Sequence, residues 1–270
     1  AIQNIYKLIA ISGIGYHCEV LDWNVFKQIQ CGFFQAGVAD LELPTDIAIQ
    51  AVLHRVALKT RVKVILSGGN IAAEGILPAS WLYNARDSHY SRSILKSVGI
   101  KPDLFEQISF GLRFEAACRL LYGIKTKYPL NHMLYDKAVA RQKLKESIGW
   151  QSYGGNHCES TFTRFTQLVY LPIRHQVDYR LCSLSTDICL GKVSREDALM
   201  KLEAKPWLDI NIQHDLAFIA RKLDYTIAQL ESLMHDSPRW YSDYPNREQF
   251  LGFVYSCYRL LTGQRKNSNF

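Results

Sequence analysis

The sequence predicts an α/β domain at residues 1–150, followed by a mainly helical region at residues 151–270. Three observations lead to this expectation. Helical and strand-like patterns alternate between residues 16 and 66, which is typical of a layered α/β domain. The run at Val62–Leu66 is short and mostly apolar, as expected at the centre of a parallel sheet. Beyond residue 150 the apolar residues follow only helical spacing.

The first elements have clear patterns. Ala1–Ser12 carries apolar residues at helical spacing, and Tyr16–Leu21 has the pattern of a strand. Asp22 is expected to cap a helix at Trp23–Ala36, because an aspartate side chain can accept hydrogen bonds from the first helical N–H groups.

The next helix begins at the string Leu43-Pro44-Thr45-Asp46, where Thr45 is the expected N-cap. Between Ile76 and Leu112 the pattern is less regular. The remaining elements of the first domain are the strand Val62–Leu66, a helix at Leu112–Tyr122, a strand at Ile124–Leu130 and a helix at Tyr135–Gly149 that ends in glycine.

The second region has six helical patterns. They lie at Ser160–Tyr170, Val177–Leu190, Ser194–Leu202, Asp215–Leu223, Ile227–Met234 and Arg247–Leu261. The string "SRED" resembles a capping box, with Ser194 as N-cap and Asp197 reaching back.

Composition limits the function classes. The 270 residues carry a net charge of +7 without any block of five like charges, so a basic nucleic-acid tail is not expected. No apolar run approaches the length of a membrane span, and the N-terminus does not resemble a signal peptide. The seven cysteines are scattered without a CxxC pair, so neither a disulfide framework nor a metal site is expected. A cytoplasmic protein is the expectation.

The string Ser67-Gly68-Gly69-Asn70 follows the apolar strand at Val62–Leu66. Ligands of open α/β sheets bind beyond the carboxyl ends of strands, and glycines there let the backbone approach a ligand. A tight turn without a ligand explains the same residues. The phosphate motif SGGxDS is matched only in its first half, because Ile71 and Ala72 stand in place of its aspartate and serine.

Two polar groups are further candidates. Thr45 and Asp46 start a helix, whose N-terminus favours an anion, although capping alone explains them. His157 and Glu159 resemble the H-x-E of zinc deaminases, but the required P-C-x-x-C is absent. With Thr163 and Arg164 they form a polar cluster at the predicted domain junction; helix capping and a surface ion pair are the simpler interpretation.

Three blocks in order resemble the N-acetyl sugar amidotransferases of bacterial surface-polysaccharide and flagellar-sugar biosynthesis. They are "LDW…LPTDIAI…ILSGGNIAAEGILPASW", "IKTKYPLNHMLYDKAVARQKLKESIGWQSYGGNHCESTFTRFTQLVYLP" and "DYRLCSLSTDICLGKVSREDAL". The resemblance runs from about Tyr16 to at least Leu199. It implies a partial Rossmann-like, adenine nucleotide alpha hydrolase (PP-loop) parallel sheet in the first domain and a helical C-terminal region on the substrate or partner side.

The resemblance also implies a reaction in lipopolysaccharide, O-antigen or nonulosonic-acid biosynthesis. ATP, with Mg²⁺, activates the acetamido oxygen of an N-acetylated nucleotide sugar as an adenylate. Ammonia then displaces AMP and leaves an acetamidino group. The ammonia comes from a glutaminase partner, often accompanied by a cyclase-like subunit; neither nucleic acid nor a membrane span is implied.

Residue roles are carried over by position. The resemblance makes Asn70 and Glu74 the candidate catalytic residues. The residues implied in ATP binding are Thr45, Asp46, Ser67, Gly68, Gly69 and Gly75. Those implied in binding the sugar or its diphosphate are Trp81, His157, Glu159, Thr163 and Arg164, the last as a phosphate partner. No residue is implied as a resident metal ligand.

The resemblance also places the family's SGGxDS loop, and its cysteine pairs, before Ala1. The 270-residue chain alone is therefore expected not to cleave ATP to AMP and pyrophosphate. Two alternatives stay open at this point: a PP-loop enzyme that modifies tRNA, in keeping with the positive charge, and a non-catalytic fragment that only binds its glutaminase partner.

Overall fold

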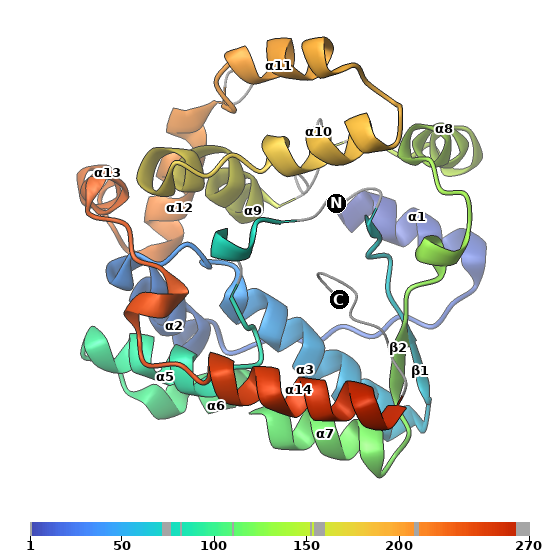
Figure 1. Ribbon diagram of the computed structural model, residues 1–270, viewed down its shortest axis with the longest axis horizontal. Helices are drawn as coiled ribbons and strands as arrows, with labels where there is room; N and C mark the ends of the chain where they lie inside the picture. The colour runs from blue at the N-terminus through green and yellow to red at the C-terminus, as the bar shows by residue number, and fades with distance from the viewer. Residues whose placement is uncertain are drawn as a thin grey trace. The chain divides into compact units, whose positions relative to one another are not determined.

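The computed structural model describes residues 2–71, 77–81, 83–109, 111–151, 153, 160–207 and 211–262. Helices make up 66% of the structure, and a small sheet of two parallel strands accompanies them (Figure 1). The chain separates into two compact units. Unit 1 comprises residues 1–20, 66–75 and 128–219; unit 2 comprises residues 21–65, 76–127 and 220–270.

Both units are discontinuous in sequence. Unit 1 contains α1 (Ile2–Ser12), η3 (Pro129–His132), α8 (Lys137–Ile148), α9 (Thr161–Phe165), the π-helical η4 (Thr166–His175), α10 (Arg180–Cys189), α11 (Arg195–Glu203) and most of α12 (Ile212–Leu223). Unit 2 contains α2 (Trp23–Ala36), α3 (Leu43–Thr60), β1 (Val64–Leu66, but for its last residue), η1 (Ala79–Trp81), α5 (Ser88–Ser97), η2 (Pro102–Leu104), α6 (Phe105–Ile108), α7 (Gly111–Leu120), β2 (Lys125–Lys127), α13 (Ile227–His235), η5 (Tyr241–Asp243) and α14 (Glu248–Thr262). The predicted boundary near residue 150 stays a prediction.

The core of unit 2 lies where α2 and α5 pack together. Phe33 and Phe34 of α2 are fully buried, as are Ile94 and Leu95 of α5. Gly32 permits the close approach of the two helices, because a Cβ atom at this position would lie 2.7 Å from Leu95 Cδ2. Burial of these large side chains is the main stabilising contribution in this unit.

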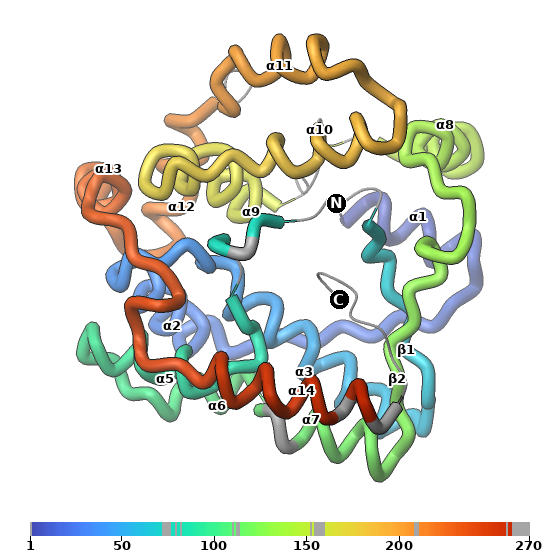
Figure 2. Tube along the Cα trace, in the orientation of Figure 1, coloured from blue at the N-terminus to red at the C-terminus, as the bar shows by residue number. Residues whose placement is uncertain are grey.

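A smaller core joins the end of α3, the end of α7 and the two strands. Its buried residues are Ala57, Cys118 and Ile124, and Ile65 of β1 packs against them. The backbone N–H of Lys125 donates to the carbonyl of Lys63 at 2.8 Å. The start of β2 therefore lies beside the start of β1 (Figure 1). Figure 2 follows the chain from β1 through α5, α6 and α7 back to β2.

Val62–Leu66 was expected to form a buried central strand, and the prediction of burial is wrong. The strand forms at Val64–Leu66, but the side chains of Val64 and Leu66 are 48% and 72% exposed. Within the described residues β1 pairs only with β2, and only Ile65 faces a core. An apolar run is buried on both sides only where layers cover both faces of the sheet.

Three further local predictions are corrected by the structure. Tyr16–Leu21 contains no regular structure, since alternating residue types form a strand only where a partner strand pairs with them. The stretch expected to be irregular contains α5, which Asp87 caps through the N–H groups of His89 and Tyr90. Thr45 lies inside the first turn of α3 rather than at its N-cap, because Pro44 already occupies a helical first-turn position.

Three other helix-boundary signals are confirmed. The capping box expected at Ser194 and Asp197 forms only in part, because the Asp197 carboxylate accepts from the Ser194 hydroxyl. Asp22 accepts from the N–H groups of Asn24 and Val25 at the start of α2. Gly149 ends α8 in the left-handed region at φ 60°, and Ser194 caps α11 by accepting from the N–H of Asp197. These contacts form within a few residues of sequence, which is why the sequence reveals them.

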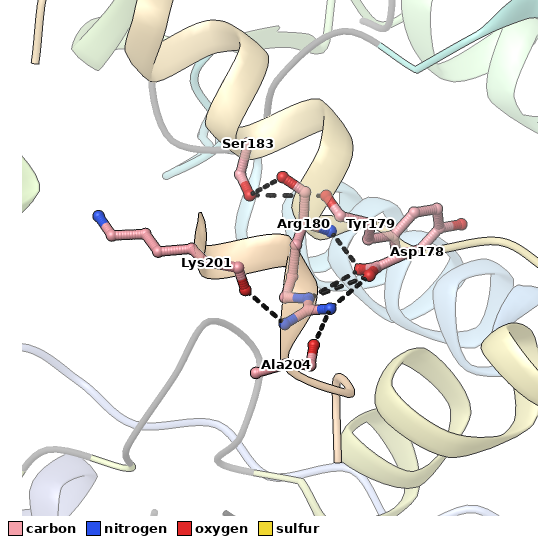
Figure 3. Close-up of polar contacts among 6 residues, drawn as sticks. All are labelled: Asp178, Tyr179, Arg180, Ser183, Lys201 and Ala204. Carbon is pink, nitrogen blue, oxygen red and sulfur yellow. Dashed lines mark hydrogen bonds and ion pairs between the residues drawn. The ribbon is translucent and has the colours of Figure 1, made fainter. Parts of the chain in front are cut away.

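In unit 1 a single arginine joins α10 to the end of α11. Figure 3 shows Arg180 bonded to Asp178 through Nε and Nη2, and to the carbonyl oxygens of Lys201 and Ala204 at 3.1 and 2.8 Å. The last carbonyls of a helix have no partner within the helix, so the guanidinium group supplies donors for them. Arg180 therefore stabilises this helical pair.

The helix α9 continues directly into the π-helical segment η4, which contains Pro172. Proline has no N–H to donate, and a wide turn accommodates the missing hydrogen bond. The segment ends at Gln176, which adopts φ 55° in the left-handed region. Among the described residues, no helix is long and apolar enough to cross a bilayer.

Candidate functional site

The loop after β1 is closed by its own side chains. The N–H of Gly69 donates to Ser67 Oγ at 3.2 Å, and Asn70 Nδ2 donates to the carbonyl of Gly68 at 3.2 Å. Asn70 is only 3% exposed. The N–H of Ile71 donates to Asn131 Oδ1, which ties the loop to η3 of the same unit. The loop predicted from the sequence is therefore an ordered turn held by hydrogen bonds.

Gly68 has no structural requirement for glycine. A Cβ atom added there would meet no atom within 4 Å, and its φ lies outside the left-handed region. Glycine at such a position lets another group approach the backbone. This open side of the loop is what a ligand contact through the backbone needs.

Four of the predicted site residues lie outside the described part of the chain. They are Glu74, Gly75, His157 and Glu159. Their roles stay predictions.

Thr45, Asp46 and Trp81 lie in unit 2, whereas the Ser67–Asn70 loop lies in unit 1. Asp46 is in the first turn of α3, and Trp81 is a half-buried residue of η1. Burial, and then the neighbouring charge of Glu42, raise the pKa of Asp46 to about 6. A carboxyl group with this pKa is mainly ionised at neutral pH and can accept hydrogen bonds from a ligand.

Arg164 is held by a carboxylate that the sequence analysis did not associate with it. Its Nε and Nη2 donate to the two oxygens of Asp215 at 2.9 and 2.7 Å, from α9 to the first turn of α12. His214 Nδ1 lies 3.2 Å from the same carboxylate. Thr163 contributes through its backbone, since its N–H donates to the capping hydroxyl of Ser160.

Asp215 is only 1% exposed, so its charge depends on these partners. Burial acts to raise its pKa, but the hydrogen bonds from Arg164 and His214 outweigh burial and hold the pKa below the usual range. The carboxylate is therefore ionised, and the bidentate pair fixes the plane of the Arg164 guanidinium. The sequence signal that could have indicated this residue is a lone acid within the apolar stripe of α12.

Unit 1 also holds two buried basic side chains, which the sequence analysis missed. Arg174 and His175 end η4 and are 7% and 5% exposed. The Arg174 guanidinium lies 5.9 Å from the ring centroid of Tyr170, and the His175 ring lies 5.5 Å from that centroid. Stacking on an aromatic face is a common arrangement for a guanidinium removed from water.

Unit 2 contains a buried cluster of two aspartates and two tyrosines, also absent from the predicted set. Tyr90 donates its hydroxyl proton to Asp40 at 2.9 Å, and Tyr241 donates to Asp87 at 2.7 Å. The rings of Tyr90 and Tyr241 meet edge to face at 4.6 Å. Asp87 also accepts from the N–H of Arg247, so it joins α5 to the start of α14. This cluster has the contacts of a structural centre.

A cavity in unit 2 is too small for a nucleotide or a sugar. It offers about 20 Å³ to the centres of water molecules, which is room for roughly one or two waters. The lining includes His54, Arg86 and Glu115, and Arg86 Nε donates to Glu115 at 2.6 Å. The pair is satisfied within the protein, so the cavity is not the candidate site.

One known protein family matches the C-terminal part of the chain. Residues 159–259 match the family described as LPS biosynthesis protein WbpG-like, C-terminal domain. This WbpG-like region includes Arg164, Asp215 and the Arg180 contacts of Figure 3. The match relates that part of the chain to lipopolysaccharide biosynthesis. No curated protein and no solved structure matches the chain.

Proposed function

We propose that this chain is part of an ATP-dependent amidotransferase of bacterial surface-polysaccharide biosynthesis. The reaction converts the acetamido group of an N-acetylated nucleotide sugar to an acetamidino group. The single observation that carries this proposal is the match of residues 159–259 to the C-terminal domain of WbpG-like LPS biosynthesis proteins. The ordered blocks of sequence that resemble N-acetyl sugar amidotransferases support it over the rest of the chain.

The proposed chemistry needs two steps. In the first step the acetamido oxygen attacks the α-phosphorus of ATP, and pyrophosphate leaves. In the second step ammonia attacks the activated carbon, and AMP leaves with the former acetamido oxygen. Because water competes with ammonia, the ammonia is proposed to come from a glutaminase partner, with a cyclase-like subunit alongside. Asn70 and Glu74 are proposed to act at the amide, since an amide side chain and a carboxylate can stabilise charge and accept the proton released by ammonia.

The nucleotide is proposed to contact the Ser67–Asn70 loop and Gly75 of unit 1. The open space beside Gly68 supports this assignment, because the fold itself does not require glycine there. The ATP-binding roles of Thr45 and Asp46, which lie in unit 2, stay predictions of the sequence. The parallel β1–β2 pair, linked through α5, α6 and α7, supports the finer proposal of a Rossmann-like PP-loop sheet.

The Mg²⁺ that accompanies ATP has little support in the described residues. No group of three His, Cys, Asp or Glu side chains there could hold a metal ion. Magnesium bound to a nucleotide takes most of its ligands from phosphate and water, with one or two carboxylates from the protein. Among the described residues predicted to bind ATP, Asp46 is the one carboxylate, and no step is assigned to the ion.

The nucleotide sugar is proposed to bind His157, Glu159, Thr163 and Arg164 of unit 1, while the role of Trp81 in unit 2 stays a prediction of the sequence. In this proposal Arg164 is the diphosphate partner, and Asp215 orients it through two hydrogen bonds. An orientation fixed before the ligand arrives lowers the entropic cost of binding. The N–H of Thr163 is taken by the capping hydroxyl of Ser160, so the role proposed for Thr163 rests on its place beside Arg164 in the sequence.

The test uses the natural gene product with ATP, an ammonium salt and a panel of N-acetylated nucleotide sugars. The expected products are AMP and a sugar in which mass spectrometry finds oxygen replaced by NH. Arg164→Lys should raise the KM for the nucleotide sugar by roughly tenfold or more. Lysine cannot form the bidentate contact with Asp215 that orients the basic group toward the diphosphate. Arg180→Lys is the matched control, since Arg180 is also paired with an aspartate but joins α10 to α11.

Formation of AMP only when tRNA is supplied would instead identify a tRNA-modifying enzyme. Binding of a glutaminase with no turnover of any sugar would identify a non-catalytic protein. Either result would overturn the proposal.

A further inference from the structure

The positive charge of the chain belongs to unit 2. Unit 1 has twelve Lys and Arg residues and twelve Asp and Glu residues, so the whole net charge of +7 falls on unit 2. Part of this charge gathers where α3, α7, β1 and β2 meet. We call the residues at this meeting point the basic–apolar patch: Lys59, Arg61, Lys63, Leu120, Leu121, Tyr122, Lys125 and Lys127.

The small core of unit 2 holds the patch together. Ala57, Cys118 and Ile124 pack beneath it, and each lies within a few residues of patch members on α3, α7 or β2. The hydrogen bond from the Lys125 N–H to the Lys63 carbonyl places the two strand ends side by side. Figure 1 shows the ends of α3 and α7 beside the paired strands.

The basic members of the patch have no acidic partners among the described residues. The five side chains are exposed, and no carboxylate of the described residues lies within ion-pair distance of Lys59, Arg61, Lys63, Lys125 or Lys127. The sequence has no Asp or Glu at residues 47–71 or 116–135, which flank the patch. The patch is thus a concentrated positive surface.

Three large apolar side chains project from the same place. Leu120, Leu121 and Tyr122 are 70%, 79% and 57% exposed, and they stand directly before Gly123, which turns the chain at φ 69°. Single exposed leucines are ordinary, but here three consecutive large apolar residues at a helix end are all more than half exposed to water.

We propose that the basic–apolar patch docks unit 2 on a bilayer surface that contains anionic lipids. Lysine and arginine side chains are attracted to anionic headgroups, while leucine and tyrosine side chains enter the boundary between headgroups and acyl chains. The basic side chains of the patch match the headgroup layer, and its apolar side chains match the boundary with the acyl chains. The proposal concerns a different part of the chain from the WbpG-like region and does not depend on the proposed reaction.

A nucleic acid fits the patch less well. Its phosphates would satisfy the lysines, but recognition of single strands relies on flat aromatic rings on which bases stack. The two exposed leucines would gain nothing from a phosphate backbone. A bilayer interface removes all three apolar side chains from water, which is why the observations favour lipid.

Flotation of the purified 270-residue chain with vesicles tests the proposal. The chain should float with vesicles of phosphatidylcholine and phosphatidylglycerol, and should remain at the bottom with phosphatidylcholine alone. The double variant Lys125→Glu/Lys127→Glu should weaken the partition by roughly tenfold or more, because each basic residue near an anionic surface contributes to binding. Lys143→Glu/Lys145→Glu on α8 changes the charge equally at exposed positions outside the patch and should retain most of the binding.

The apolar half is tested in the same way. Leu120→Ser/Leu121→Ser should reduce binding even at low salt, whereas Leu199→Ser/Met200→Ser should not, although those side chains are 52% and 59% exposed. Unchanged thermal midpoints would show that each variant is folded. The proposal is overturned if anionic vesicles do not bind, if patch and control variants bind equally, or if an RNA oligomer binds more tightly and ignores the leucine change.

Discussion

Asp215 of unit 1 and Asp40 of unit 2 are both buried, and they are held in different ways. Asp215 in unit 1 is 1% exposed and Asp40 in unit 2 is 4% exposed. Asp215 accepts two hydrogen bonds from the Arg164 guanidinium and lies beside His214. Asp40 accepts one from the Tyr90 hydroxyl, and its Oδ2 has no hydrogen-bond donor within reach among the described residues.

The difference in partners reverses the effect of burial. Burial raises the pKa of Asp40 to about 7, against the weaker opposing effect of the Tyr90 hydrogen bond. At Asp215 burial acts in the same direction, but the hydrogen bonds and charges of Arg164 and His214 lower the pKa below its usual range. At these two sites the hydrogen-bond partners set the direction of the pKa shift: the guanidinium and imidazole groups lower the pKa of Asp215, whereas the single Tyr90 hydroxyl does not offset burial at Asp40.

The two groups should therefore link stability to pH with opposite signs. Because the folded pKa of Asp215 is lowered, its contribution is present above the unfolded pKa of about 3.9 and is lost as the pH falls further. Because the folded pKa of Asp40 is raised, the native state holds a proton that the unfolded state releases. Its effect is a loss of stability as the pH rises from about 4 through about 7.

The largest effect is expected from breaking the charged pair. Arg164→Ala leaves the Asp215 carboxylate buried without its main counter-charge, which costs about 3–5 kcal/mol of unfolding free energy. Chemical denaturation at neutral pH measures this loss. A change below about 1 kcal/mol would show that Asp215 does not depend on the guanidinium.

The second effect comes from neutralising the other carboxyl group. Asp40→Asn keeps an acceptor for the Tyr90 hydroxyl but cannot ionise, so it should stabilise the protein at about pH 8 by on the order of 2–4 kcal/mol. The gain should shrink as the pH falls and vanish below about pH 4, where Asp40 is protonated in the unfolded state as well as in the native state. Thermal midpoints of both proteins across this range check the prediction; parallel curves would contradict it.

The smallest loss of unfolding free energy is expected from removing His214, and it tests which partner holds Asp215 ionised. His214→Ala removes an imidazole whose side chain is 67% exposed, so solvent screens its interaction with the carboxylate. The expected loss is about 0–1 kcal/mol, well below that of Arg164→Ala. A loss equal to the arginine variant would mean that His214, not Arg164, holds the carboxylate ionised.

How far the sequence predicts this molecule depends on the range of each contact. Asp22, Gly149 and Ser194 were identified as helix boundaries, because caps act within a few residues of the chain. The strand expected at Tyr16–Leu21 was wrong, because strand formation requires a distant partner that local alternation does not reveal.

The same limit applies to the candidate site. The local string Ser67–Asn70 indicates a glycine turn after a strand, and the structure shows a hydrogen-bonded turn there, while its contact with a ligand stays a prediction. The Asp215 that holds Arg164 is 51 residues away in sequence, and Tyr241 lies 154 residues from Asp87. Such pairs form only when the chain folds, so residue types and spacing do not indicate them.

The most direct test of the comparison is a carbon-13 NMR titration of the aspartate carboxyl carbons in the folded protein. Asp40→Asn and Asp215→Asn spectra assign the two signals. The account predicts that Asp40 titrates near pH 7, while Asp215 remains ionised below the usual pKa of an aspartate. Titration of both groups at the usual aspartate value, or of Asp215 above Asp40, would contradict it.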